Sequence, residues 1–99
     1  MKVKLKNQLV DVKQIPTLQA LAFLFSRLKF WEKVAIGADL DGGDTLYMIR
    51  IISASLDRTE EWLGSLTLPE LASAWVSVCE VNRFIHALPY AVQLRDHGE

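Results

Sequence analysis

The sequence predicts a mostly α-helical chain with a small N-terminal β-hairpin, an α+β domain of three to four helices. Polar and apolar residues alternate over 3–12 around a turn at Asn7–Gln8, which is typical of a hairpin. Apolar residues over 17–36 recur at three- and four-residue steps, as they do on a helix. The stretch Thr-Leu-Pro-Glu at 67–70 is typical of a helix start.

The length and composition predict one domain. A chain of 99 residues, 51% apolar and 23% charged, can fold around one modest core. We expect a single domain over 1–99, with the hairpin at 1–13, the helical core at 17–88 and a loose tail at 90–99. Because so small a domain buries a limited share of its surface, oligomerisation is expected as well.

The first expected helix runs from a Thr17 cap to about Ile36, after Pro16 ends the hairpin. Its apolar residues cover two faces. One face comprises Leu21, Leu24, Phe25, Leu28, Trp31 and Ala35, and the other comprises Ala20, Phe23, Phe30 and Val34. Such a helix is either central in its domain or shared with a neighbouring chain. Gly37 is placed to end it, because glycine adopts the left-handed cap conformation without a steric penalty.

The second half of the chain predicts further helices. The segment 46–56 fits two structures, because its β-branched residues favour a strand while its Ile and Leu spacing suits a helix face; we expect a helix and leave the strand open. Residues 58–66 predict a short helical segment. The last helix begins at a Thr67 cap, continues through Ile85 and is limited by Pro89.

The stretch Ala38–Leu46, ADLDGGDTL, has the composition of a metal or phosphate site. An EF-hand calcium loop begun at Asp39 would place Gly43 and Arg50 where oxygen ligands belong. The Asp-x-Asp-Gly-Thr motif of haloacid-dehalogenase-like phosphatases is interrupted here by Gly43 and Asp44. We therefore expect a turn that caps the next helix, and we expect no metal, no cofactor and no catalytic residue.

The remaining candidates for chemistry predict packing. Cys79 is the only cysteine, which excludes an internal disulfide, and its place on an apolar helix face predicts a buried, inert thiol. Neither His86 nor His97 has the neighbours of a nucleophile or a metal ligand. The N-terminus lacks the pattern of a signal peptide, and no apolar run is long enough to span a bilayer, so we expect a cytoplasmic protein.

Charge is distributed unevenly along a chain whose formal net charge is −1. Residues 1–33 carry seven basic and two acidic side chains, a net charge of +5, whereas residues 34–70 carry two basic and seven acidic ones, a net charge of −5. The basic third lacks a nucleic-acid reader motif, so nucleic-acid binding is not expected. The division favours head-to-tail packing of identical subunits, which would be sensitive to ionic strength.

Aromatic residues predict where a partner binds. The chain has three tryptophans, and aromatic side chains dominate the energetics of protein interfaces. The two-sided apolar helix points to the same kind of surface. We expect partner contacts at Phe23, Phe30, Trp31 and Trp62.

Three stretches resemble the small tail assembly chaperones of long-tailed bacteriophages. They are VKLKNQLVDVKQIPTLQALAFL near the N-terminus, EEWLGSL in the middle and LTLPELASAWVSVCEVNRFIHALP near the C-terminus. The helix entry at Ile15–Leu21 and the Val-Asn-x-Phe pattern at 81–84 contribute to the resemblance. It implies a non-enzymatic cytoplasmic protein that self-associates, coats the aggregation-prone tape-measure protein and recruits tail-tube subunits.

A second function remains open. The acidic middle, residues 39–61, is also typical of a small phage or bacterial inhibitor that docks on a host protein as a mimic of nucleic acid. A ring or filament in solution, or a tape-measure gene immediately downstream, would favour the chaperone. A strict monomer that binds a host protein would favour the inhibitor.

Overall fold

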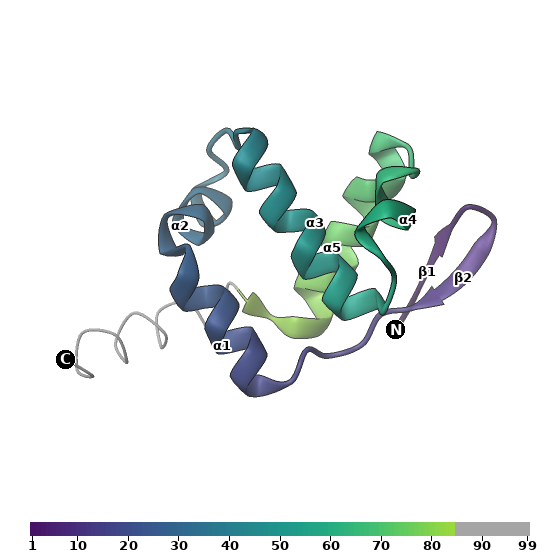
Figure 1. The fold of residues 1–99 in the computed structure, drawn as a ribbon, viewed down its shortest axis with the longest axis horizontal. Coiled ribbons are helices and arrows are strands. Elements are labelled where there is room, and N and C mark those ends of the chain that lie inside the picture. The colour runs from purple at the N-terminus through teal and green to yellow at the C-terminus, as the bar shows by residue number, and fades with distance from the viewer. Residues whose placement is uncertain (85–99) are drawn as a thin grey trace.

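The computed structural model describes residues 1–84 and confirms the α+β class, because a hairpin precedes a set of helices (Figure 1). The strands are β1 (Lys2–Leu5) and β2 (Gln8–Asp11). The helices are α1 (Thr17–Ser26), α2 (Leu28–Ile36), α3 (Gly42–Leu56), α4 (Glu60–Gly64) and α5 (Leu68–Asn82). The predictions for residues 85–99, including the tail at 90–99, lie outside the described residues.

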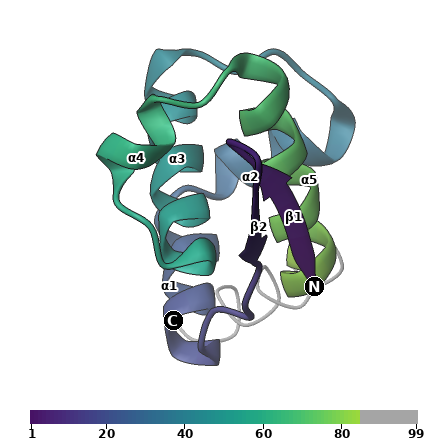
Figure 2. The same cartoon turned by 90° about the vertical axis from the view of Figure 1, so that its right-hand side faces the viewer.

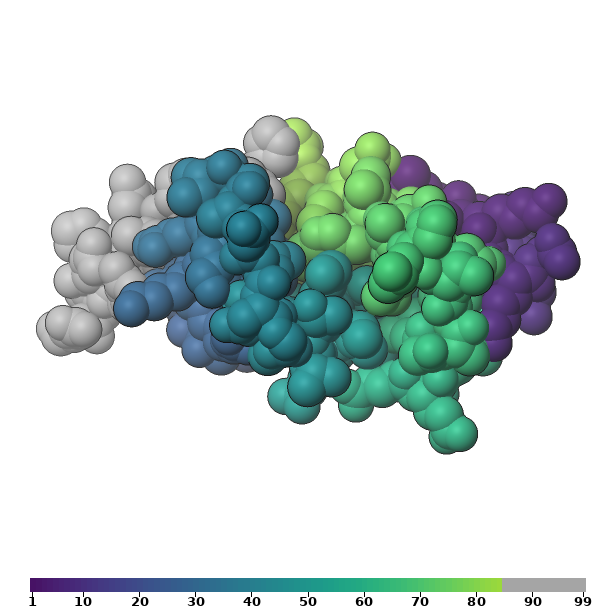
Figure 3. Space-filling view, turned by 90° about the horizontal axis from the view of Figure 1, so that it is seen from above, coloured from purple at the N-terminus to yellow at the C-terminus, as the bar shows by residue number. Residues whose placement is uncertain are grey.

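The hairpin and the α1–α2 pair lie at opposite ends of the molecule, with α3 and α5 between them (Figures 1 and 2). The space-filling view shows the hairpin forming one end, next to α4 (Figure 3). β1 packs on α5, and α3 packs on both α4 and α5. The largest fully buried side chains are Trp31, Phe30 and Phe84, so the bulky part of the core lies beneath α2 and the C-terminal end of α5.

The hairpin turn lies one residue earlier than the sequence predicts. The prediction places it at Asn7–Gln8, whereas the loop is Lys6–Asn7, with φ angles of 50° and 60°. Two left-handed residues suit a two-residue hairpin loop, because their twist matches that of the strands. The resulting register places Val3 opposite Val10, so this apolar pair shares the face that packs on the core.

The single helix predicted over 17–36 is in fact two helices. Arg27 separates α1 from α2 with φ −146° and ψ 65°. In a continuous helix the carbonyl oxygen of Phe23 would accept from the Arg27 N–H. Here that oxygen accepts from the Tyr47 hydroxyl and, at 3.2 Å, from Trp31 Nε1. The Ser26 hydroxyl donates to the same oxygen at 3.1 Å, so side chains replace the missing helical bond, which stabilises the break.

Several local predictions are confirmed. Gly37 ends α2 in the left-handed conformation, with φ 71°. The segment 46–56 is helical within α3, and α4 lies within the short helix predicted at 58–66. At the start of α5 the Thr67 hydroxyl accepts from the Glu70 N–H at 3.3 Å, and the Glu70 carboxylate accepts from the Thr67 N–H at 3.0 Å.

Two helix ends differ from their predictions. Thr17 does not cap α1; it is the first helical residue, because Pro16 takes the cap position and its carbonyl oxygen accepts the first helical bond. α5 ends at Asn82, before the predicted limit at Ile85, which lies outside the described residues. Arg83 adopts the left-handed conformation, φ 54°, and its N–H bonds back into the helix, which is a common way for a helix to end.

Asn82 joins three parts of the fold. Its Oδ1 accepts from the Ile15 N–H at 2.7 Å, and its Nδ2 donates to Val78 O at 2.9 Å and to Ser55 Oγ at 3.3 Å. The Ser55 hydroxyl in turn donates to Lys13 O at 2.7 Å. The segment between the hairpin and α1 is therefore bonded to both α3 and α5.

We expect Asn82→Ala to lower the free energy of unfolding by about 1–3 kcal/mol, because it leaves the Ile15 N–H without its partner. Urea unfolding followed by circular dichroism measures this loss. Gln14→Ala is the matched control, since the exposed Gln14 amide makes only a 3.5 Å bond to Val81 O; its effect should stay within about 0.5 kcal/mol. Equal losses in the two variants would contradict a structural role for the Asn82 amide.

Candidate partner-binding site

α1 is an apolar helix that the described fold leaves largely uncovered. It contains no charged residue and has seven apolar residues among its ten. Of these ten described residues Leu24 alone is buried, whereas Leu18 is 84% exposed and Phe25 is 40% exposed. A contiguous apolar surface of this kind is typical of a contact with another molecule.

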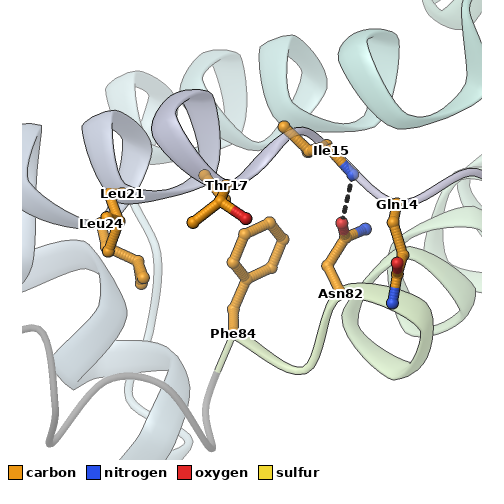
Figure 4. A pocket seen from close by; sticks show the side chains of 8 residues that line it. Gln14, Ile15, Thr17, Leu21, Leu24, Asn82 and Phe84 are labelled. Carbon is orange, nitrogen blue, oxygen red and sulfur yellow. Dashed lines mark hydrogen bonds between the residues drawn. The ribbon is translucent and has the colours of Figure 1, made fainter.

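An open pocket of about 310 Å³ lies beside α1, facing the C-terminal end of α5 (Figure 4). We call it the apolar pocket. Figure 4 shows the Phe84 ring lying between Thr17 and Asn82. The apolar side chains that line the pocket are Ile15, Ala20, Leu21, Leu24 and Phe84. The pocket can therefore accept an apolar side chain, and the polar groups of Gln14 and Thr17 can hydrogen-bond to the backbone of the segment that carries it.

A second hollow of about 460 Å³ lies at the junction of α1 and α2. We call it the basic hollow. It is lined by Phe25, Ser26, Arg27, Leu28, Lys29, Phe30, Lys33 and Asp44. These residues carry three positive charges and one negative charge. Because Phe25 belongs to both α1 and the lining, the exposed surface of α1 leads into the basic hollow.

Asp44 is the one buried charged side chain among residues 1–84, with 1% of its surface exposed. Its Oδ2 accepts from Lys33 Nζ at 2.9 Å and from the Asp41 N–H at 3.1 Å, and its Oδ1 accepts from Arg27 Nη2 at 2.7 Å. The bond from Lys33, followed by that from Asp41, holds the pKa of Asp44 below its ordinary value of 3.8. The same contact raises the pKa of Lys33. One carboxylate thus holds two cations at the break between α1 and α2.

The stretch Ala38–Leu46 connects α2 to α3 and caps α3, as predicted. Asp41 is the cap: its Oδ1 accepts from the Asp44 N–H at 2.8 Å, and Asp44 bonds back to the Asp41 N–H. The burial of Asp44 was not predicted. Within the described residues, no group of three or more His, Cys, Asp or Glu side chains is arranged to hold a metal ion.

The four predicted partner residues lie in two environments. Phe30 and Trp31 are buried, at 1% and 0% exposure, so a partner reaches them only if the fold opens. Phe23 and Trp62 are half-buried. Phe23 belongs to α1, whereas Trp62 lies on α4 with the Lys6 ammonium 5.3 Å from its ring centroid. The structure therefore does not bring all four together on one surface.

Sequence reasoning did not predict four residues of this site as partner contacts. Leu18 and Phe25 carry the exposed surface of α1, Phe84 lines the apolar pocket, and Lys29 lines the basic hollow. The two-sided apolar pattern of residues 17–36 pointed toward the surface of α1, but it gave no indication of Phe84 or Lys29. That pattern indicates a shared helix without indicating which side is shared.

Cys79 is half-buried on α5, and burial raises the pKa of its thiol to about 11. The thiol therefore stays protonated near neutral pH and is a poor nucleophile, as its predicted packing role requires. His86 and His97 lie outside the described residues. In the part of the chain that the structure describes, no helix combines the length and the apolar character needed to cross a membrane.

No protein-family model, curated protein or solved structure matches this chain. The structure itself therefore defines the class of the protein: it is a small α+β domain with an uncharged, exposed apolar helix. This helix lies between an apolar pocket and a basic hollow.

Proposed function

We propose that this chain is a non-enzymatic tail assembly chaperone of a long-tailed bacteriophage. It self-associates and, in the host cytoplasm, binds the tape-measure protein and tail-tube subunits during tail assembly. The observation that carries the proposal is α1, an uncharged helix with seven apolar residues of which Leu24 alone is buried within the described fold. An apolar helix face of this kind binds another apolar segment and shields it from aggregation.

The apolar pocket supports the same function. A segment lying along α1 can place one large apolar side chain between Leu21 and Phe84, where the pocket lining is mostly apolar. The resemblance over the three stretches of sequence names the class of partner that needs such shielding, an aggregation-prone tape-measure protein.

The alternative function, inhibition of a host protein, requires exposed acidic surface in residues 39–61. Asp44 is buried and bonded to Arg27 and Lys33. Glu60 Oε1 lies 4.0 Å from Arg50 Nε. The burial of Asp44 removes one carboxylate from the acidic surface that a host protein could contact, while Glu60 stays exposed. The exposed apolar surface of α1, which a mimic of nucleic acid does not require, favours the chaperone.

Co-expression with the tape-measure protein encoded immediately downstream tests the proposal. We expect tape-measure protein to be soluble with the wild-type chain and insoluble without it. Leu18→Glu, on α1, should remove this effect. Leu68→Glu is the matched control because Leu68 is 82% exposed at the start of α5, close to the 84% of Leu18, and it should keep the effect. The proposal fails if the tape-measure protein stays insoluble, if no such gene adjoins this one, or if the two variants behave alike.

A further inference from the structure

We propose that the segment bound along α1 is an apolar helix followed by acidic residues, whose carboxylates enter the basic hollow. This inference rests on the proposed function for the apolar surface and specifies the chemistry of the partner. The juxtaposition that carries it is an uncharged apolar helix ending at a hollow lined by three cations.

The exposed surface of α1 has a direction. Leu18, Ala22 and Phe25 lie on one helix face because they are spaced four and three residues apart. They span about 10 Å, or two turns. None of the described residues that line the apolar pocket, which extends along α1 from Thr17 to Leu24, is charged, whereas the basic hollow begins at Phe25. Among the described residues that line these two hollows, a partner helix therefore meets charged side chains only at the Phe25 end.

The positive charge of the hollow is only partly neutralised. Asp44 bonds to Arg27 and Lys33. Lys29 is exposed and forms no salt bridge within the described residues. Phe25 also lines the hollow, and its apolar ring lowers the local dielectric constant. The attraction between Lys29 and an approaching carboxylate is therefore stronger than in open water. Complementary charge of this kind selects the partner and fixes its direction.

A protein segment fits these features better than a membrane does. Helices that lie in a lipid interface carry lysines and arginines along their own polar face. α1 has no charged residue, and its nearest cation, Arg27, follows its last turn and is bonded to Asp44. Positive charge placed at one end favours a ligand that has its own negative charge at one end.

Three synthetic helical peptides of about four turns test the inference. They share one Leu/Ala face and end in three Glu, three Gln or three Lys residues. Fluorescence anisotropy at low salt should show the Glu peptide binding about five- to tenfold more tightly than the Gln peptide, and the Lys peptide binding most weakly. The differences should shrink at about 0.5 M salt, where the Debye length falls to about 4 Å.

Charge reversal in the protein provides the control. Lys29→Gln should reduce the preference for the Glu peptide, and Lys29→Glu, which balances the charges that line the hollow, should give nearly equal affinities for the Glu and Lys peptides. Lys4→Glu, an equal charge change at an exposed position on β1, should keep the wild-type order. Circular dichroism confirms that each variant is folded before its affinities are compared.

The outcomes separate this inference from the proposed function. If no peptide binds, or if Leu18→Glu leaves binding unchanged, the apolar-surface function itself fails. Equal binding of all three peptides that Lys29→Glu does not alter overturns the acidic-partner inference alone. The inference is also overturned if anionic vesicles displace the Glu peptide. The oligomeric state of the protein alone gives a last test. If the protein forms oligomers that dissociate when Lys29 is replaced by Glu, a second copy of the chain fills the hollow and the inference is overturned.

Discussion

Phe30→Ala is expected to lower the free energy of unfolding by about 3–5 kcal/mol, a large share of the stability of a domain this small. Phe30 is 1% exposed. Its ring meets those of Trp31 and Tyr47 edge-on, with centroids 5.0 Å apart in each case, and that of Trp75 at 6.0 Å. Removing it costs the buried surface and leaves a cavity. That cavity collapses poorly, because Trp31 and Tyr47 are both held by hydrogen bonds to the Phe23 carbonyl.

Phe25→Ala is the matched control, since it removes the same side chain from the exposed surface of α1. Phe25 is 40% exposed, so its loss should change stability by about 1 kcal/mol or less while weakening peptide binding. Urea unfolding and anisotropy, applied to both variants, separate core from surface. If Phe30→Ala kept full stability and lost only partner binding, the packed rings of Phe30, Trp31 and Tyr47 would be a partner surface and not part of the core.

The local features of this fold were predictable because they depend on a few neighbouring residues. The Thr67–Glu70 pair caps α5, and Gly37 ends α2, through bonds and dihedrals that short sequence windows encode. The break at Arg27 was not predictable in the same way. It depends on Trp31 and Tyr47, which reach the Phe23 carbonyl only once α2 and α3 have packed. The apolar spacing of the sequence continues across Arg27, so nothing in the pattern marks the break.

The candidate site was likewise only partly predictable from the sequence, because it depends on residues far apart in the chain. The two-sided apolar pattern of 17–36 predicted one helix, either central or shared with a neighbouring chain, whereas the structure has an exposed apolar helix, α1, followed by α2. Which side remains exposed depends on Phe84, about sixty residues away, which forms one wall of the apolar pocket. The charge of the hollow depends on the burial of Asp44, since an aspartate in a glycine-rich turn is ordinarily solvated. Its partners Arg27 and Lys33 lie 17 and 11 residues away.

The Asp44 cluster is expected to make the fold sensitive to acid. The pKa of Asp44 is lowered in the folded chain from an ordinary value of 3.8, and hydrogen bonds from Thr67 and Lys6 likewise lower the pKa of Glu70 from 4.5. A group whose folded pKa is lowered stabilises the fold above its unfolded pKa, and this contribution is lost as the pH falls through the folded value. Lys33 has the opposite sign, because its pKa is raised from 10.5 and its contribution is lost above that pH. Stability should therefore be highest between about pH 5 and pH 10 and fall on both sides.

Asp44→Asn isolates the contribution of this carboxylate. The variant keeps the shape of the side chain but leaves Arg27 and Lys33 without a counter-charge, so its urea midpoint at about pH 7 should fall below that of the wild type. Asp39→Asn, in the same connection but exposed, should show little change. Between about pH 6 and pH 3 the midpoint of Asp44→Asn should decline less steeply than that of the wild type, because the titrating group is gone. Parallel declines would contradict the assignment.

The same substitution links the fold to the proposed site. Arg27 and Lys33 line the basic hollow, so replacing Asp44 with asparagine removes the one negative charge among its lining residues. We expect Asp44→Asn to bind the peptide ending in Glu more tightly than the wild type at low salt, although the protein is less stable. Opposite changes in stability and affinity would not arise from partial unfolding, which weakens both. If affinity for the Glu peptide fell together with stability, the hollow would act only as part of the scaffold that holds α1 against α2.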